Sequence, residues 1–414
     1  MGRSSRRPSS SCAATCSPPA SSVRTANSAT ATRSRSSRAA KSLPLALRAW
    51  LPARWSRWSA GWQWRCGIVA DAFAEFVNAA KQEPRSHPLD QPVATWTERE
   101  VLGDNEVEAG VAILRTRGCY WSIREGCAMC GYFNDTVPGG VSTEALQVQW
   151  AQVLPQLAGK RYAKIYTSGS FLDPTEVPLA FARQAMAEMH ESGIEKVLIE
   201  SLPEFVHARH MDYGDAPALE VAIGLESATP LVLDKCVNKR MTWGGFTRAC
   251  ANARAAGASV KAYVLLKPPF LNEAQAIDDA VASIERAAPH VDKVSINPVN
   301  VQRHTVVERL FRRGEWSAPW LWSVLEVLRR TRKCDVRVYS DPTGGGTQRG
   351  AHNCGECDQT LLDALTAHRL GGPLPAAACD CRGRWKALLA QGGVRRDGAE
   401  PRGYRRGFRG GRRF

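Results

Sequence analysis

The chain has 414 residues, and its 44% hydrophobic content is enough for a sizeable core in one or two domains. Its net charge of +15 belongs to the ends, because residues 1–66 carry 12 basic and no acidic side chains and residues 382–414 carry 11 basic and two acidic ones. The region between them carries 32 basic and 38 acidic residues. No run of 18 apolar residues occurs, which argues against a membrane span, and cysteines in metal-type spacings indicate a reducing, cytoplasmic location.

The composition predicts two tails around a folded centre. Residues 1–69 are rich in Arg and Ser and show no helical or strand period, so we expect a disordered or artefactual extension there. We expect residues 70–110 to form an N-terminal segment that leads into the folded centre. The end of the chain, 391–414, reads GYRRGFRGGRRF at its close and resembles either the Arg and Gly segments that bind single-stranded nucleic acid or a merely solvated tail.

Between the tails, short β-branched runs alternate with helical patterns. Strands are expected at 111–115, 163–167, 196–200, 219–224, 260–266 and 292–296, and the segments between them include TEALQVQWAQVLPQL after Ser142. Strands separated by helices form a parallel sheet with ligand sites at the carboxyl ends of the strands. The pattern therefore predicts an α/β fold over 111–340, either a partial (βα)6 barrel or a closed parallel barrel.

Three cysteines stand close together after the first expected strand, in GCYWSIREGCAMCGY: Cys119, Cys127 and Cys130. Three thiolates can bind three irons of a 4Fe-4S cluster and leave the fourth iron open to a ligand, whereas clusters that only carry electrons usually have four cysteines. Zinc is the alternative, but it requires a tetrahedral set of four ligands and no histidine lies near these three. The spacing favours iron and sulfur.

Polar residues follow each of the next four expected strands. They are Gly169 and Ser170 after the second strand, Glu200 at the end of the third, Glu226 and Ser227 after the fourth, and Lys267 after the fifth. Each alone has an ordinary reading as a turn or a solvated cap. Because the carboxyl ends of parallel strands meet at one rim, we expect these residues and the three cysteines to share a site.

A second cysteine group follows the barrel, in a small lobe expected at 341–390. It comprises Cys354, Cys357, Cys379 and Cys381, with His352 nearby. Four thiolates suffice for a closed tetrahedral site, and zinc is the first choice because a structural ion would clamp a lobe with little core of its own. A second iron cluster and free thiols are the alternatives.

Over about residues 105–385 the chain resembles the radical S-adenosylmethionine enzymes and, more closely, the family of radical subunits of archaeosine synthase, which acts on archaeal tRNA. The resemblance rests on RTRGCYW with GCAMCGYFND, YTSGSFLDP, IESLPEF, AIGLES, VKAYVLLKPPFL and HNCGECD followed by CDC. One departure is the seven residues between the first two cysteines, more than the CxxxCxxC of most radical enzymes has.

The resemblance implies a role for each rim residue. The first three cysteines would hold a 4Fe-4S cluster whose open iron binds S-adenosylmethionine. Gly169 and Ser170 match the segment beside the methionine amino group of that cofactor, and Glu200 matches a carboxylate that helps to hold it. Glu226 and Ser227 lie where the family contacts the ribose.

The resemblance also implies a reaction. One electron from an external donor would cleave the cofactor to a 5'-deoxyadenosyl radical. That radical would act on a tRNA whose deazaguanine at position 15 carries a lysine, and breaking the lysine carbon to nitrogen bond would leave the formamidine of archaeosine. Lys267 would face the cofactor carboxylate or a tRNA phosphate. Because the central region is acidic, a transglycosylase-like partner subunit is expected to make many of the contacts that bind the tRNA.

Two other functions stay open at this point. One is a different radical enzyme on tRNA, such as a methylthiotransferase or an Elongator-like enzyme, although a second cysteine trio and an acetyltransferase domain are not found in the sequence. The other is a metal-scaffolded tRNA-binding protein without catalysis.

Overall fold

The computed structural model describes residues 72–82 and 86–391. The tails predicted at 1–69 and 391–414 lie outside these residues, apart from Gln391. Within the described part of the chain, no helix combines the length and the apolar character that a bilayer crossing requires.

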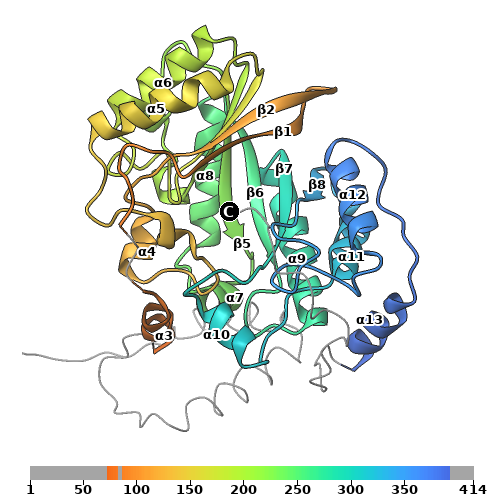
Figure 1. Cartoon of the computed structure of the whole chain (residues 1–414). Coiled ribbons are helices and arrows are strands. Elements are labelled where there is room, and N and C mark those ends of the chain that lie inside the picture. Colours follow the sequence, from red (N-terminus) through yellow and green to blue (C-terminus); the bar gives the residue numbers. More distant parts are fainter. Residues whose placement is uncertain (1–71, 83–85, 392–414) are drawn as a thin grey trace, which may run out of the picture. The chain divides into compact units, whose positions relative to one another are not determined.

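One sheet of eight strands organises the described residues (Figure 1). The strands are adjacent in chain order, and all pairs are parallel except β1 with β2, which form an antiparallel hairpin. Their bounds are β1 Ala94–Leu102, β2 Asn105–Ile113, β3 Tyr162–Tyr166, β4 Lys196–Ser201, β5 Ala218–Glu226, β6 Ser259–Leu266, β7 Lys293–Pro298 and β8 Arg337–Ser340. Because β1 and β8 do not pair with each other, the sheet is a partial barrel and not a closed one, which is the first of the two predicted forms.

The six predicted strands correspond to β2–β7, and the α/β class is confirmed. Two strands were not predicted. Residues of β1 alternate between half-buried and exposed and include several charges, and β8 has only four residues. The hairpin turns at Gly103 and Asp104, where Gly103 has a φ of 62° that a residue without Cβ adopts at little cost.

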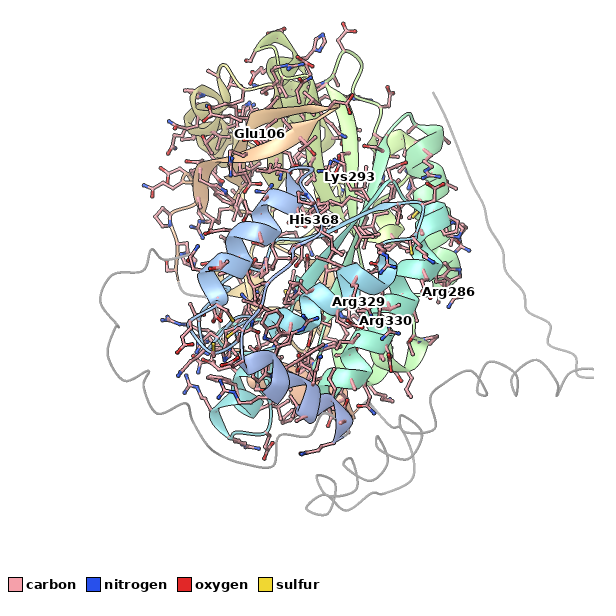
Figure 2. All side chains as sticks on the ribbon, turned by 90° about the vertical axis from the view of Figure 1, so that its right-hand side faces the viewer. Glu106, Arg286, Lys293, Arg329, Arg330 and His368 are labelled. Carbon is pink, nitrogen blue, oxygen red and sulfur yellow. The ribbon has the colours of Figure 1, made fainter. Side chains whose placement is uncertain are left out.

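The longer helices cover one face of the sheet. They are α5 Thr143–Leu157, α6 Leu179–Glu191, α8 Trp243–Ala255, α9 Glu273–Ala287 and α11 Leu321–Thr331. Side chains at their starts fix three of them: Ser142 caps α5, Thr242 caps α8, and Asn272 forms a capping box with Gln275 at α9. Figure 2 shows Arg286 of α9 and Arg329 and Arg330 of α11 on these outer helices.

The remaining helices connect strand ends or lie in the C-terminal lobe. Their bounds are α3 Ala72–Ala80, α4 Tyr120–Arg124, α7 Pro230–Val232, α10 Val306–Arg312, α12 Asp358–Arg369 and α13 Cys381–Ala390, with 3-10 turns at Tyr132–Asp135, Pro203–Phe205, Ala208–His210 and Ala288–His290 and a π-helical turn at Leu233–Val237.

The two faces of the sheet differ in chemistry. Toward the helices the strands present aliphatic side chains such as Ile165, Ile199 and Ile296, all fully buried. The alternate residues of the strands, whose side chains face away from the helices, include an unusual number of Lys, Glu and Tyr for parallel strands. They include Lys164, which pairs with Glu98 at 2.6 Å and also with the buried Glu100.

Helix α12 closes the seam between the two edge strands. From its last residue, the Arg369 guanidinium donates to the Arg99 carbonyl of β1 at 2.8 Å and lies 3.6 Å from the Glu100 carboxylate. The Arg337 side chain of β8 donates to the Arg369 carbonyl. Burial alone would raise the pKa of Glu100, but the Lys164 ammonium outweighs it and lowers that pKa to about 2.

Candidate cluster and cofactor site

The loop that carries the first three cysteines lies between β2 and α5. Cys119 immediately precedes the short helix α4, and Gly118 and Gly126 on either side of that helix have φ values of 79° and 84°. These left-handed positions let the chain turn sharply twice within a few residues. The loop then continues through Cys127 and Cys130, which are joined by a hydrogen bond from the Cys130 amide to the Cys127 carbonyl at 3.3 Å.

Segments from the carboxyl ends of other strands hold this loop. The Cys119 amide donates to the Ser168 carbonyl after β3 at 3.3 Å, and the Ala128 amide donates to the Val237 carbonyl after β5 at 2.8 Å. The Val307 amide of α10, after β7, donates to the Ala128 carbonyl at 3.3 Å. The carboxyl-end rim therefore does bring together segments that lie far apart in the sequence.

The three cysteines are half-buried and close enough to influence one another electrostatically. Burial raises the pKa of Cys130 to about 12 and also raises the pKa of Cys119 and Cys127. A cluster offers each thiolate a different iron, and positively charged iron would favour the thiolate form that burial opposes.

Gly169 lies where a side chain would not fit. A Cβ atom there would stand 2.1 Å from Oε2 of Glu176 and 2.6 Å from the Cys119 amide nitrogen. The buried Glu176 carboxylate accepts hydrogen bonds from the Ser170 amide at 2.7 Å and from the Thr116 hydroxyl at 2.7 Å. Burial raises the pKa of Glu176 to about 7 although these bonds lower it. The glycine thus allows the loop after β3 to approach the cysteine loop.

A buried ion pair stands beside the thiols. The Lys239 ammonium lies 3.0 Å from the Glu226 carboxylate at the end of β5 and donates to the Gly224 carbonyl at 2.5 Å. Burial raises the pKa of Cys127, and the charge of Lys239 is the first influence that lowers it. Asn238, at a φ of 61°, orients Lys239 while its amide group donates to the Gly126 carbonyl at 2.7 Å.

Sequence reasoning missed Lys239 and Glu176. The asparagine before Lys239 is a weak signal for a left-handed position, and it alone could have drawn attention to this segment. Glu176 carried no signal, because its role depends on a loop that tertiary packing brings to it.

Glu200 lies near the end of β4 and is half-buried. Burial raises its pKa, while a hydrogen bond from the Tyr263 hydroxyl and the charge of Lys261 act in the opposite direction. Glu200 and Glu226 are close enough to influence each other electrostatically. Both predicted carboxylates thus belong to the same polar region.

Three other predicted residues have protein partners. The Ser170 hydroxyl accepts a hydrogen bond from the Leu202 amide at 3.0 Å. The fully buried Ser227 hydroxyl donates to Asp279 at 3.0 Å, and Lys267 forms a buried ion pair with Glu273 at 2.6 Å. The structure therefore turns Ser227 and Lys267 toward α9 and its start rather than toward the cysteines.

Backbone strain collects at the same rim. Ser168 after β3, Glu226 at the end of β5 and Lys267 after β6 have φ values of 61°, 61° and 65°. Residues with a Cβ atom rarely adopt this conformation, and such positions gather at functional sites.

The second cysteine group forms a compact cluster. Sγ of Cys354 lies 3.8 Å from that of Cys357 and 3.7 Å from that of Cys379, and Cys357 and Cys381 are 3.6 Å apart. Four thiolates around one ion with bonds of about 2.3 Å would stand about 3.8 Å apart. The cluster can therefore hold one metal ion, as predicted, and His352 is not among its ligands.

Two side chains orient these sulfur atoms. The Trp322 indole donates to Sγ of Cys381 at 3.1 Å, and the Asn353 amide group donates to Sγ of Cys357 at 3.3 Å. Donors of this kind favour thiolates and fix the ligands of a metal. Through Trp322, the lobe is attached to α11 of the barrel.

Changing Cys381 to Ser should remove one metal ion per chain and lower the unfolding temperature by roughly 10 °C, because a lost structural metal belongs to the most damaging class of change. Metal analysis and thermal unfolding measure both effects. Cys334→Ser, at a half-buried cysteine outside both groups, is the matched control. An unchanged metal content in the Cys381 variant would contradict a metal at this cluster.

Known proteins resemble this chain over most of its length. An archaeosine synthase subunit beta of Methanosarcina acetivorans is 35% identical over 316 residues, which are 73% of this chain and 91% of that protein. One of Thermococcus kodakarensis is 34% identical over 323 residues, 72% of this chain and 96% of that protein. No family model matches the chain.

Solved structures resemble the chain less closely. The Elp3 protein of Methanocaldococcus infernus, solved with an N-terminal deletion, is 14% identical and has a TM-score of 0.38, covering 69% of this chain and 64% of that one. A likeness of this size carries no conclusion about function.

Proposed function

The chain belongs to the archaeosine synthase subunit beta family, and from this premise we propose that it is a radical S-adenosylmethionine enzyme that modifies tRNA by breaking the lysine carbon to nitrogen bond of a lysine-bearing 7-deazaguanine, leaving a formamidine. The observation that carries the proposal is the convergence of the three half-buried cysteines with the Gly169 loop and the Glu226–Lys239 pair at the carboxyl ends of the strands.

The three cysteines would hold a 4Fe-4S cluster, and the rim around them would hold S-adenosylmethionine. Together these groups supply radical chemistry that no amino acid side chain provides. Gly169 would leave room beside the cluster, and Lys239 would balance the negative charge of the thiolates. Glu200 and Glu226 supply acceptors for ammonium or hydroxyl groups of the cofactor.

The family name describes a subunit, so we propose that a partner subunit and tRNA complete the active assembly. An external electron donor is needed because the reaction starts from a reduced cluster. At the C-terminal cluster we propose zinc, since four thiolates at tetrahedral spacing are its usual structural ligands.

We also propose that the functional core spans about residues 70–390. Lys81, just after α3, donates to the Glu125 carbonyl at 2.7 Å, and its ammonium is close enough to the three cysteines to feel their charge. Helix α3 is therefore attached to the cysteine loop, and the core must begin before it.

An anaerobic assay of the reconstituted full chain tests the function. With dithionite, S-adenosylmethionine and lysine-modified tRNA, we expect 5'-deoxyadenosine together with tRNA that has lost its lysine and gained a formamidine, read by mass spectrometry. Unmodified tRNA is the control. A loaded cluster that yields no 5'-deoxyadenosine, with the partner subunit present, would instead support a non-catalytic scaffold.

A further inference from the structure

The face of the sheet that is not covered by the long helices carries partly exposed residues near the carboxyl ends of the strands. On neighbouring strands, the residues Tyr166, Glu200, Tyr263 and Asn297 all have the parity of this face, and all are half-buried. The residues that precede and follow them on the same strands are mostly buried. Their partial exposure therefore marks a polar lumen that adjoins the site at the rim.

Deeper in this lumen most charges are paired. The nearly inaccessible Glu220 accepts from Lys196 at 2.6 Å and from Lys293 at 3.0 Å, and the Tyr162 hydroxyl donates to it at 3.1 Å. Lys164 is paired with Glu98 and Glu100, as described above. These groups fill the amino-terminal end of the barrel, and each lysine among them already has a carboxylate partner.

Lys261 differs from the other lysines of the lumen. It is only 5% exposed, yet in the described part of the chain its ammonium makes no ion pair and no hydrogen bond. Its contacts are with the rings of Tyr263 and Tyr339, at 4.9 and 5.4 Å from the ring centroids. Lys261 stands two residues before Tyr263 on β6. It therefore lies one layer below the four half-buried residues Tyr166, Glu200, Tyr263 and Asn297.

The charge of Lys261 acts to lower the pKa of Glu100, Glu200 and Glu220, but it forms an ion pair with none of them. Two tyrosine faces offset only part of the cost of burying such a cation. The paired lysines around it show that the fold can supply carboxylates where it needs them. A lysine without an ion pair, one layer below partly exposed polar residues, is suited to an anionic ligand that arrives with the substrate.

We propose that Lys261 binds the carboxylate of the lysine carried by the tRNA base, with the Tyr263 and Tyr339 rings flanking it. This inference rests on the proposed function. Whichever nitrogen of that lysine is joined to the base, its carboxylate stays free and negatively charged, so a site that accepts the substrate must satisfy it. The Lys261 contact would place the bond to be broken nearer to the rim.

A pair of substrates and two variants test the inference. The probes are a tRNA carrying lysine on the deazaguanine and the same tRNA carrying 1,5-diaminopentane, which lacks only the carboxylate. Lys261→Met should weaken binding of the lysine form about 10- to 100-fold, because a charged hydrogen bond is lost. It should not change binding of the diaminopentane form, and Lys261→Arg should restore most of the affinity for the lysine form.

Each alternative has its own outcome. Equal weakening for both tRNAs, or a lower unfolding temperature in Lys261→Met, would show a purely structural lysine. A loss of S-adenosylmethionine affinity in equilibrium dialysis would show that Lys261 binds the cofactor carboxylate instead. Wild-type protein that binds both tRNAs as proposed but never cleaves the lysine form would defeat the proposed function and leave this inference standing.

Discussion

Cys127→Ser should lose the 4Fe-4S cluster and form no detectable 5'-deoxyadenosine from S-adenosylmethionine. The thiol lies in a loop that is held by hydrogen bonds with the segments after β3, β5 and β7. A serine hydroxyl in a buried site stays protonated and is a poor ligand for iron. Iron analysis, the visible absorption of the cluster and the anaerobic assay measure the loss.

The matched control for this change is Cys334→Ser, which alters a half-buried cysteine outside both cysteine groups and should keep its iron and its activity. The metal of the C-terminal cluster should also remain in Cys127→Ser, because those four ligands lie together and do not include Cys127. Full cluster content in the Cys127 variant would show that this cysteine is not a ligand and would remove the basis of the proposed function.

The central strands could be predicted from sequence because each is a short β-branched run between helical segments. The edge strands could not. The face of β1 that carries Glu98 and Glu100 is polar because it meets Lys164 inside the barrel, and a charged alternating segment of this kind does not distinguish an edge strand from a loop. Whether the sheet closes was likewise undetermined, since closure depends on pairing between β1 and β8.

The candidate site was predictable to the extent that it lies at strand ends. Parallel topology alone places Gly169, Glu200 and Glu226 at the rim that holds the cysteine loop. It does not indicate which polar groups remain available for a ligand. Ser227 and Lys267 occupy the same rim, yet their polar atoms are bound to Asp279 and Glu273, acidic residues that sequence reasoning did not connect with them.

The contact between Gly169 and the cysteine loop leads to the second large prediction. Gly169→Ala should reduce 5'-deoxyadenosine formation about 100-fold, since a displacement of about 1 Å in an active site can cost this much. The added Cβ would stand 2.1 Å from Oε2 of Glu176 and 2.6 Å from the Cys119 amide, so either the carboxylate or the first cysteine must move. Activity and the electron paramagnetic resonance of the reduced cluster, with and without S-adenosylmethionine, measure the effect.

Gly139→Ala provides the control, because a Cβ at Gly139 meets nothing within 4 Å and its φ is not in the left-handed region. If only Glu176 moves, Gly169→Ala should lose stability while the reduced cluster keeps its response to S-adenosylmethionine. If Cys119 moves, that response should change even where the iron content is preserved. A Gly169 variant that matches Gly139→Ala in stability, activity and spectrum would mean that the close approach of these two loops has no part in the chemistry, and that a side chain beside the cluster is tolerated.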